Sequence, residues 1–174
     1  MSTSLKDLPQ IDEEQLQDVA SRFLEEGQTF KELHGLADEE LEAVYAVAHN
    51  FVTNGKFRQA ESLFRFLCFY DHLNRNYWMG LGVCRKGMGN FEAAVHAFGL
   101  AGILDLHDPR AALQSAECHL RLGHTDEAVS ALNAALASGA EHEKFQPIRE
   151  KAALMLSAVQ SGESNLETSS GPKT

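Results

Sequence analysis

The side chains best suited to reaction chemistry are three cysteines, Cys68, Cys84 and Cys118, and eight histidines. Thiolates and imidazoles hold zinc when they recur at short spacings such as Cys-x-x-Cys or His-Glu-x-x-His. Neither spacing occurs, no glycine-rich phosphate loop is present, and the neighbours Cys118 and His119 would point in different directions on a helix. The sequence therefore predicts no catalytic residues, no metal, no cofactor and no enzyme activity.

The same cysteines indicate a compartment. An odd number without close pairs argues against a disulfide framework and favours reduced, buried thiols in a cytoplasm. No apolar run approaches the roughly 18–20 residues of a membrane helix, and residues 1–10 lack the pattern of a signal peptide. The net charge of -10 disfavours direct binding to nucleic acid or to an anionic membrane.

A second set of side chains is suited to binding. Its apolar members, such as Tyr45 and Met79, are expected to be partly exposed in one groove, and contiguous exposed apolar surface marks interaction sites. Tyrosine offers a ring and a hydroxyl group, and methionine adapts its shape, so both suit an extended peptide. For any single member, the alternative is ordinary packing between helices. The predicted groove residues are Glu42, Tyr45, His49, Val52, Asn76, Met79, Val83, Lys86, Arg110, Leu113, Glu117 and Leu120.

These residues are positioned by a repeat of 34 residues, which gives three consecutive units, 41–74, 75–108 and 109–142, without gaps. This period is that of the tetratricopeptide repeat, a pair of helices. The predicted groove residues stand at unit positions 2, 5, 9 and 12, on the inner side of each first helix. The columns that show the period are Gly55, Gly89 and Gly123; Ala60, Ala94 and Ala128; Ala48, Gly82 and Ala116; and Phe64, Phe98 and Leu132.

Each column has a physical role. Glycine at 55, 89 and 123 ends the first helix of each unit, because glycine tolerates the left-handed conformation. The small residues let two helices approach closely. One unit cannot bury its apolar face alone, so the units must stack. The predicted fold is therefore all-α: a right-handed α-solenoid with N-terminal helices and a C-terminal capping helix.

The flanking segments complete this organisation. Apolar residues at helical spacing predict a helix before Gly27, a short helix before Gly35 and a helix that covers the last unit. Asp38 is the expected N-cap of the first repeat helix. The predicted segments are a disordered N-terminus 1–10, a helical segment 11–37 that contains helices 11–26 and 29–34, a repeat region 38–142, a capping helix 143–160 and a disordered tail 161–174.

Three motifs give a more specific resemblance. They are LCxxDH at 67–72, GLGxCR at 80–85 and AECHLxLG at 116–123. With the stretch 27–64, they resemble the class II chaperones of bacterial type III secretion systems. The resemblance covers residues 15–160, most of the chain.

The resemblance implies a function and its partners. Family members hold two pore-forming, hydrophobic translocator proteins in the bacterial cytoplasm before export, and bind a short proline- and leucine-containing segment, extended, in the concave groove. Groove aromatics of the family fall on Tyr45, His49 and Val52, of which Tyr45 alone keeps a benzene ring. Members form homodimers through the N-terminal helix; some act with a transcriptional activator, which this sequence does not decide. The implied dimer residues are Leu16, Val19, Phe23 and Leu24.

Repeats of this kind also serve two other binding functions. An adaptor that clamps a partner's C-terminal carboxylate needs basic and amide residues at unit positions 5 and 9, and this sequence lacks them. A tetratricopeptide-repeat scaffold or adaptor within a protein assembly remains the alternative to a chaperone.

Overall fold

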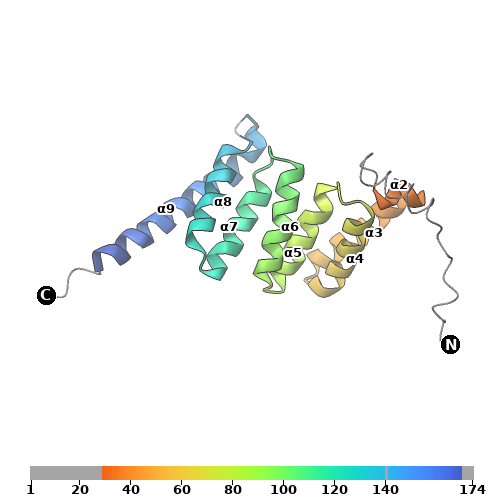
Figure 1. Ribbon diagram of the computed structural model, residues 1–174, viewed down its shortest axis with the longest axis horizontal. Coiled ribbons are helices and arrows are strands. Elements are labelled where there is room, and N and C mark those ends of the chain that lie inside the picture. The colour runs from red at the N-terminus through yellow and green to blue at the C-terminus, as the bar shows by residue number, and fades with distance from the viewer. Residues whose placement is uncertain (1–28, 140, 170–174) are drawn as a thin grey trace, which may run out of the picture.

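The computed structural model describes residues 29–139 and 141–169, and over these residues its regular secondary structure is helical. The helices follow one another as a row of antiparallel pairs (Figure 1). Helices that are consecutive in the chain are neighbours in space from α3 to α9. This arrangement confirms the all-α solenoid of tetratricopeptide repeats.

Each 34-residue unit contains one helix pair. The glycine that follows the first helix of each pair has a positive φ angle, 71° at Gly55, 79° at Gly89 and 75° at Gly123. The prediction that these glycines end helices in the left-handed conformation is confirmed. The pairs are α3 (Asp38–Thr53) and α4 (Phe57–Tyr70), α5 (Arg75–Gly87) and α6 (Phe91–Leu104), and α7 (Arg110–Leu122) and α8 (Thr125–Ala137).

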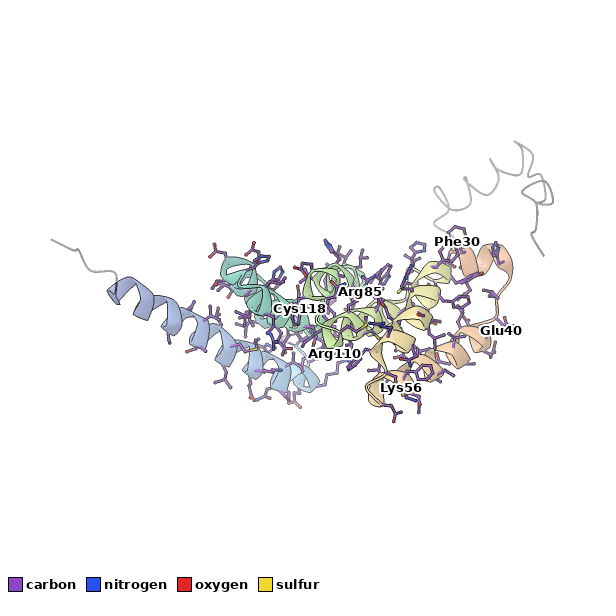
Figure 2. The ribbon with its side chains drawn as sticks, turned by 90° about the horizontal axis from the view of Figure 1, so that it is seen from below. Phe30, Glu40, Lys56, Arg85, Arg110 and Cys118 are labelled. Carbon is purple, nitrogen blue, oxygen red and sulfur yellow. The ribbon has the colours of Figure 1, made fainter. Side chains whose placement is uncertain are left out.

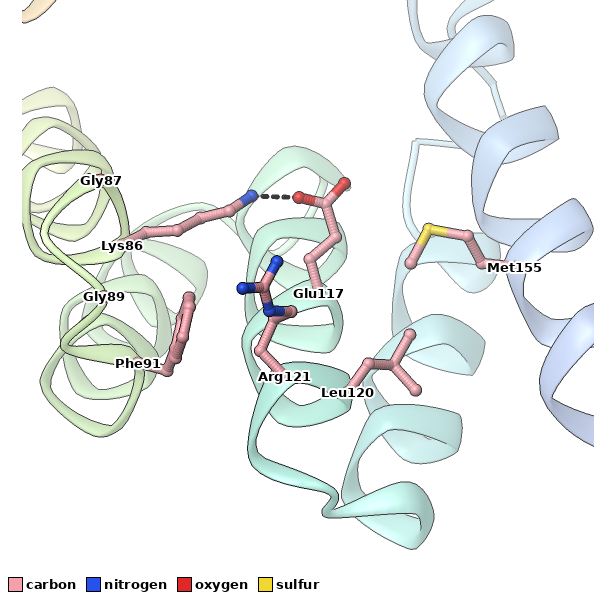
Figure 3. A pocket seen from close by; sticks show the side chains of 8 residues that line it. All are labelled: Lys86, Gly87, Gly89, Phe91, Glu117, Leu120, Arg121 and Met155. Carbon is pink, nitrogen blue, oxygen red and sulfur yellow. Dashed lines mark hydrogen bonds and ion pairs between the residues drawn. The ribbon is translucent and has the colours of Figure 1, made fainter. Parts of the chain in front are cut away.

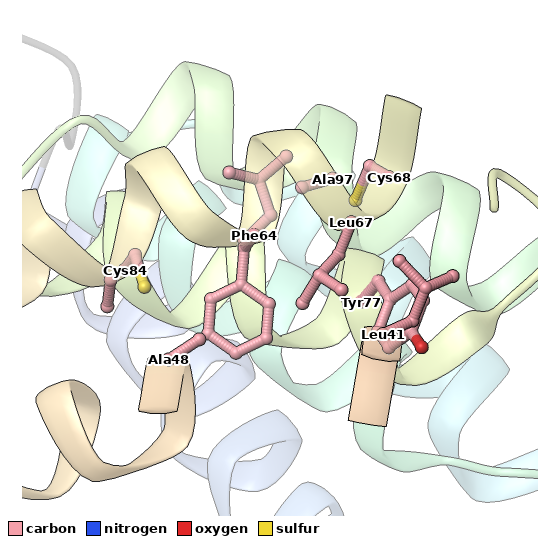
Figure 4. Packing of buried hydrophobic residues seen from close by; sticks show 10 residues of the cluster. Leu41, Ala48, Phe64, Leu67, Cys68, Tyr77, Cys84 and Ala97 are labelled. Carbon is pink, nitrogen blue, oxygen red and sulfur yellow. The ribbon is translucent and has the colours of Figure 1, made fainter. Parts of the chain in front are cut away.

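The small residues of the repeat lie at close helix contacts. Ala48, Ala116 and the alanines at 60, 94 and 128 are fully buried. Gly82 faces the ring of Phe98, and a methyl group at Gly82 would lie 2.4 Å from that ring. A methyl group at Gly80 would lie 2.1 Å from the ring of Phe64. The core therefore excludes even one extra carbon at these two glycines. Figure 4 shows Phe64 among the buried residues of this core.

All three cysteines are buried free thiols. Burial raises the pKa of Cys68 and that of Cys84 to about 12, and it also raises the pKa of Cys118. A thiol with a raised pKa is a poor nucleophile and a poor metal ligand at neutral pH, because the thiolate is the reactive form. The interpretation of these cysteines as core residues is confirmed.

The short helix α2 (Phe30–His34) precedes the repeats. The amide of Glu32 donates to the side chain of Thr29, and the amide of Thr29 donates to the carboxylate of Glu32. The expected cap at Asp38 is wrong, since α3 begins there and Ala37 is the N-cap residue, whose amide donates to the Glu40 carboxylate. The Asp38 carboxylate accepts a 2.6 Å hydrogen bond from Lys31 instead.

The C-terminal cap is longer than the sequence predicted. A single 3-10 turn, η2 (Glu143–Phe145), leads into α9 (Gln146–Ser169), which packs on α8 and α7 (Figures 1 and 2). The predicted tail 161–174 is therefore helical as far as Ser169. Pro147 stands in the first turn of α9, where proline is tolerated. No proline follows it before Pro172, and one glycine, Gly162, costs a helix only about 1 kcal/mol. The predicted segment 1–10, the helix 11–26 and the dimer residues Leu16, Val19, Phe23 and Leu24 lie outside the described residues.

Candidate functional site

A cavity of about 210 Å³, here called the first cavity, opens between α3, α5 and the start of α7. It joins residues that are far apart in the sequence but share the inner side of the first helices. Seven of the predicted groove residues line it, namely Tyr45, His49, Val52, Asn76, Met79, Val83 and Arg110, together with Phe64, Arg75 and Gly80.

Aromatic rings form one wall of the first cavity. The half-buried ring of Tyr45 lies 5.9 Å from the ring of Phe64 and 5.8 Å from that of Tyr77, measured between centroids. The ring of His49 lies 6.2 Å from that of Tyr45. Phe64 reaches the cavity because Gly80 leaves room for its ring. Rings fixed in this way present a preformed apolar surface.

A charged cluster borders the same cavity. The Asp108 carboxylate lies 2.9 Å from Arg75 Nη2 and accepts hydrogen bonds from Arg110 Nε at 2.9 and 3.0 Å. Burial alone would raise the pKa of Asp108, but the hydrogen bonds from Arg110 and the charge of Arg75 outweigh it and hold that pKa below its usual range. The carboxylate is therefore ionised at neutral pH and fixes both guanidinium groups at the cavity.

Sequence reasoning missed Arg75. Its side chain is 12% exposed, and burial lowers its pKa. A signal was available: Arg75 occupies unit position 1, where the other two units have Leu41 and Pro109, both buried. A charged residue in a core column of a repeat indicates a buried ion pair or a binding role.

A second cavity, of about 520 Å³, lies farther along the stack between α5, α7 and α9. Figure 3 shows Lys86 and Phe91 on one side of it and Met155, from α9, on the other. Three predicted groove residues line it, Lys86, Glu117 and Leu120. The remaining lining residues are Gly87, Gly89, Phe91, Arg121 and Met155.

An ion network crosses the second cavity. Glu117 accepts from Lys151 of α9 at 2.5 Å and from Lys86 of α5, which also donates to Gln114 at 2.7 Å. Burial alone would raise the pKa of Glu117, but the hydrogen bonds from Lys151 and Lys86 outweigh it and lower that pKa below its ordinary value. The network ties three helices together across the second cavity.

Two predicted residues line neither cavity. Leu113 is 2% exposed and packs with Ala116, Leu132 and Ala152, so the prediction that it offers apolar groove surface is wrong. The physical reason is α9, whose apolar side covers the third unit where a further repeat would otherwise stack. Glu42 is an exposed residue of α3. Ten of the twelve predicted residues thus border the two cavities.

The described ranges contain neither a cluster that would hold a metal ion nor a helix that would cross a membrane. Across 29–139 and 141–169, no three histidine, cysteine or acidic side chains come together in a way that would hold a metal ion. Among the helices of those ranges, none combines the length and the hydrophobicity that a membrane crossing needs.

Comparison with known sequences places the chain among repeat proteins and chaperones. Tetratricopeptide-repeat family models match residues 41–74, which coincide with the first unit, and residues 85–143. The chain is 32% identical over 148 residues to the low calcium response locus protein H of Yersinia pestis, covering 85% of this chain and 88% of the relative. It is 28% identical over 153 residues to the chaperone protein SicA of Salmonella dublin, covering 88% and 90%.

Solved structures of proteins from type III secretion systems also match most of the chain. A type III secretion complex from Aeromonas hydrophila matches with a TM-score of 0.81 at 29% identity, over 84% of this chain and 98% of that one. PcrH of Pseudomonas aeruginosa, bound to the chaperone binding region of PopD, matches with a TM-score of 0.72 at 35% identity, over 74% and 97%. SycD of Yersinia enterocolitica, bound to a peptide of the translocator YopD, gives 0.70 at 31%, over 74% and 98%, and a further SycD structure shows an alternative dimer.

Proposed function

Because this chain belongs to the translocator chaperones of bacterial type III secretion systems, we propose that its groove binds a short extended segment of hydrophobic translocator proteins. Binding keeps these clients in solution in the bacterial cytoplasm until they are exported. The observation that carries the proposal is the first cavity, where the apolar residues Tyr45, Met79 and Val83 pack against the core but stay partly accessible.

The size of the first cavity favours a peptide over a compact ligand. Its volume of about 210 Å³ is below the roughly 300–1,000 Å³ of pockets that enclose small molecules. A cavity of this size accommodates individual side chains. In an extended segment, alternate side chains point the same way, so apolar residues enter the groove while the intervening residues face outward.

The other features of the proposed function follow from the same family. Holding is passive, because the preformed groove supplies the binding energy, so neither nucleotide nor catalysis takes part. The clients are two translocator proteins, and the working form is a homodimer assembled through 11–26, with Leu16, Val19, Phe23 and Leu24 at the contact. A transcriptional activator is a further partner that a subset of the family uses.

The proposal is tested by co-expression with candidate translocators from neighbouring genes, followed by affinity purification. Met79→Glu places a charge in the first cavity and should abolish co-purification, because a carboxylate would be desolvated by the bound segment. Val47→Glu is the matched control. Val47 is 50% exposed on α3, the first helix of its unit, and borders neither cavity. Helical circular dichroism establishes that both variants fold. Equal client recovery with folded Met79→Glu and with the unmodified chain would overturn the groove assignment.

A further inference from the structure

We propose that the segment bound in the groove carries an acidic side chain next to its apolar residues, and that the second cavity receives this pair. The inference rests on the proposed function and specifies its ligand: an apolar side chain enters beside Leu120 and Met155, and the adjacent carboxylate binds Arg121. The first cavity then selects for an apolar side chain alone, and the second cavity selects for an apolar side chain with an acidic neighbour.

The charges that line the groove oppose the charge of the chain as a whole. The protein has a net charge of -10. The two cavities are nevertheless lined by four cations, Arg75, Arg110, Lys86 and Arg121. Two carboxylates stand against them, Glu117 at the second cavity and Asp108 in the cluster beside the first. Positive charge concentrated on a concave surface of an acidic protein favours an acidic ligand, because complementary potentials select the partner.

Arg121 is the cation of this set that keeps its charge available. Arg75 and Arg110 share the Asp108 carboxylate, and Lys86 shares Glu117 with Lys151. Among the ion pairs of the described residues, none involves Arg121. Its guanidinium group is exposed and lies 5.2 Å from the centre of the Phe91 ring at the second cavity. The ring holds the guanidinium group in place without neutralising it.

The apolar part of the second cavity lies beside this cation. Leu120 and Met155 are half-buried, and they come from α7 and α9 (Figure 3). Methionine adapts to side chains of different shape, so this part of the cavity tolerates several apolar residues. The carboxylate of Glu117 is already bound by two lysines, so it repels an acidic ligand less than a free carboxylate would.

The two cavities follow one another along α5. Met79 and Val83 border the first cavity, and Lys86, one turn farther, borders the second. From Met79 to Lys86 the axis of α5 advances about 10 Å at 1.5 Å per residue. An extended segment covers this distance in about three residues. Arg121 lies beyond Lys86, on α7, so we place the acidic residue at least about three positions from the residue that fills the first cavity.

The test is a display selection of random 16-residue peptides against four forms of the full chain. They are the unmodified protein, Arg121→Glu, Arg58→Glu and Met79→Glu. Arg58 is an exposed residue of α4 that borders neither cavity, so Arg58→Glu makes the same change of net charge away from the groove. The frequency of Asp and Glu near the apolar residues is counted in the selected peptides. One selected peptide and its Glu→Gln version are then titrated by fluorescence anisotropy.

The unmodified chain and Arg58→Glu should both select peptides with Asp or Glu at least about three positions from an apolar anchor. Arg121→Glu should lose that preference and bind the Glu-containing peptide about 3–10-fold more weakly, with the Gln version changed less than about twofold. Apolar peptides without an acidic preference from the unmodified chain, or an unchanged preference with Arg121→Glu, would overturn this inference and leave the proposed function intact. No enrichment by the unmodified chain, or the same peptides with Met79→Glu, would overturn the proposed function and this inference with it.

Discussion

The first and third repeats use the same position differently. Tyr45 and Leu113 both stand at unit position 5, yet Tyr45 is half-buried at the edge of a cavity and Leu113 is 2% exposed in the core. The difference is the next helix: α5 leaves a cavity beside α3, and α9 covers the corresponding surface of α7. The position in the repeat therefore determines which way a side chain points. The neighbouring helix determines whether that side chain is buried or stays accessible.

The largest expected effect concerns the third repeat, here called the closed end because α9 covers it. Leu113→Ala should lower the free energy of unfolding by about 2–5 kcal/mol, because it removes buried carbons and leaves a cavity under α9. Met79→Ala, at the same unit position but half-exposed, should lower it by roughly 1 kcal/mol. Urea denaturation followed by circular dichroism measures both. Equal losses would show that the two ends of the stack do not differ in burial.

Peptide affinity should show the reverse order. A peptide from the selection above should bind Leu113→Ala within about twofold of the unmodified chain, and should bind Met79→Glu at least about 10-fold more weakly. Fluorescence anisotropy at a temperature where all variants remain folded gives both values. A weaker affinity for Leu113→Ala than for Met79→Glu would move the binding site to the third repeat.

Two glycines within helices offer a second comparison: Gly80 lines the first cavity, and Gly99 lies in α6 away from it. Gly80→Ala should destabilise by about 1–3 kcal/mol, because the added methyl group would lie 2.1 Å from the Phe64 ring. Gly99→Ala, where nothing lies within 4 Å of the added methyl group, should instead stabilise by about 0.5–1 kcal/mol. Thermal denaturation distinguishes the signs. A stable Gly80→Ala variant would mean that Phe64 is free to leave the cavity wall.

The smallest effect is a pH dependence of the closed end. The lowered pKa of Glu117 means that its contribution to stability is present above its unfolded pKa of about 4.3 and is lost as the pH falls through the folded value. Glu117→Gln should therefore be less stable than the unmodified chain at pH 7, with the difference shrinking toward pH 3. Urea midpoints at both pH values test this. A constant difference would exclude the ionised Glu117 from holding α9.

The sequence was sufficient for the features that repeat. The spacing of Gly55, Gly89 and Gly123 predicted three helix ends, since the left-handed turn restricts the residue type at each. The position of Met79 in its unit predicted that it faces the inner side of the first helices, where it lines the first cavity. These features depend on the local chain and on contacts that every unit shares.

Features that break the repeat were not predictable in the same way. The burial of Leu113 depends on α9, a helix outside the repeat. The charged cluster around Asp108 depends on Arg75, a charged residue where the other units have an apolar one. Its role is visible only once the fold brings Arg75 and Arg110 to the same carboxylate. In the first two cases a contact between different units or segments decided the outcome. At the start of α3 the Glu40 carboxylate accepts from the backbone amide of Ala37, so residue type at position 38 was a poor guide.

Site-specific photo-crosslinking tests the groove most directly. A photoreactive amino acid is placed at the position of Met79 in one form and of Leu100 in another, and each is co-expressed with a candidate translocator. Leu100 is 42% exposed on α6, away from both cavities. A crosslink to the translocator is expected from position 79 and none from position 100. A crosslink from position 100 alone would place the client on the opposite helices and contradict binding in the first cavity.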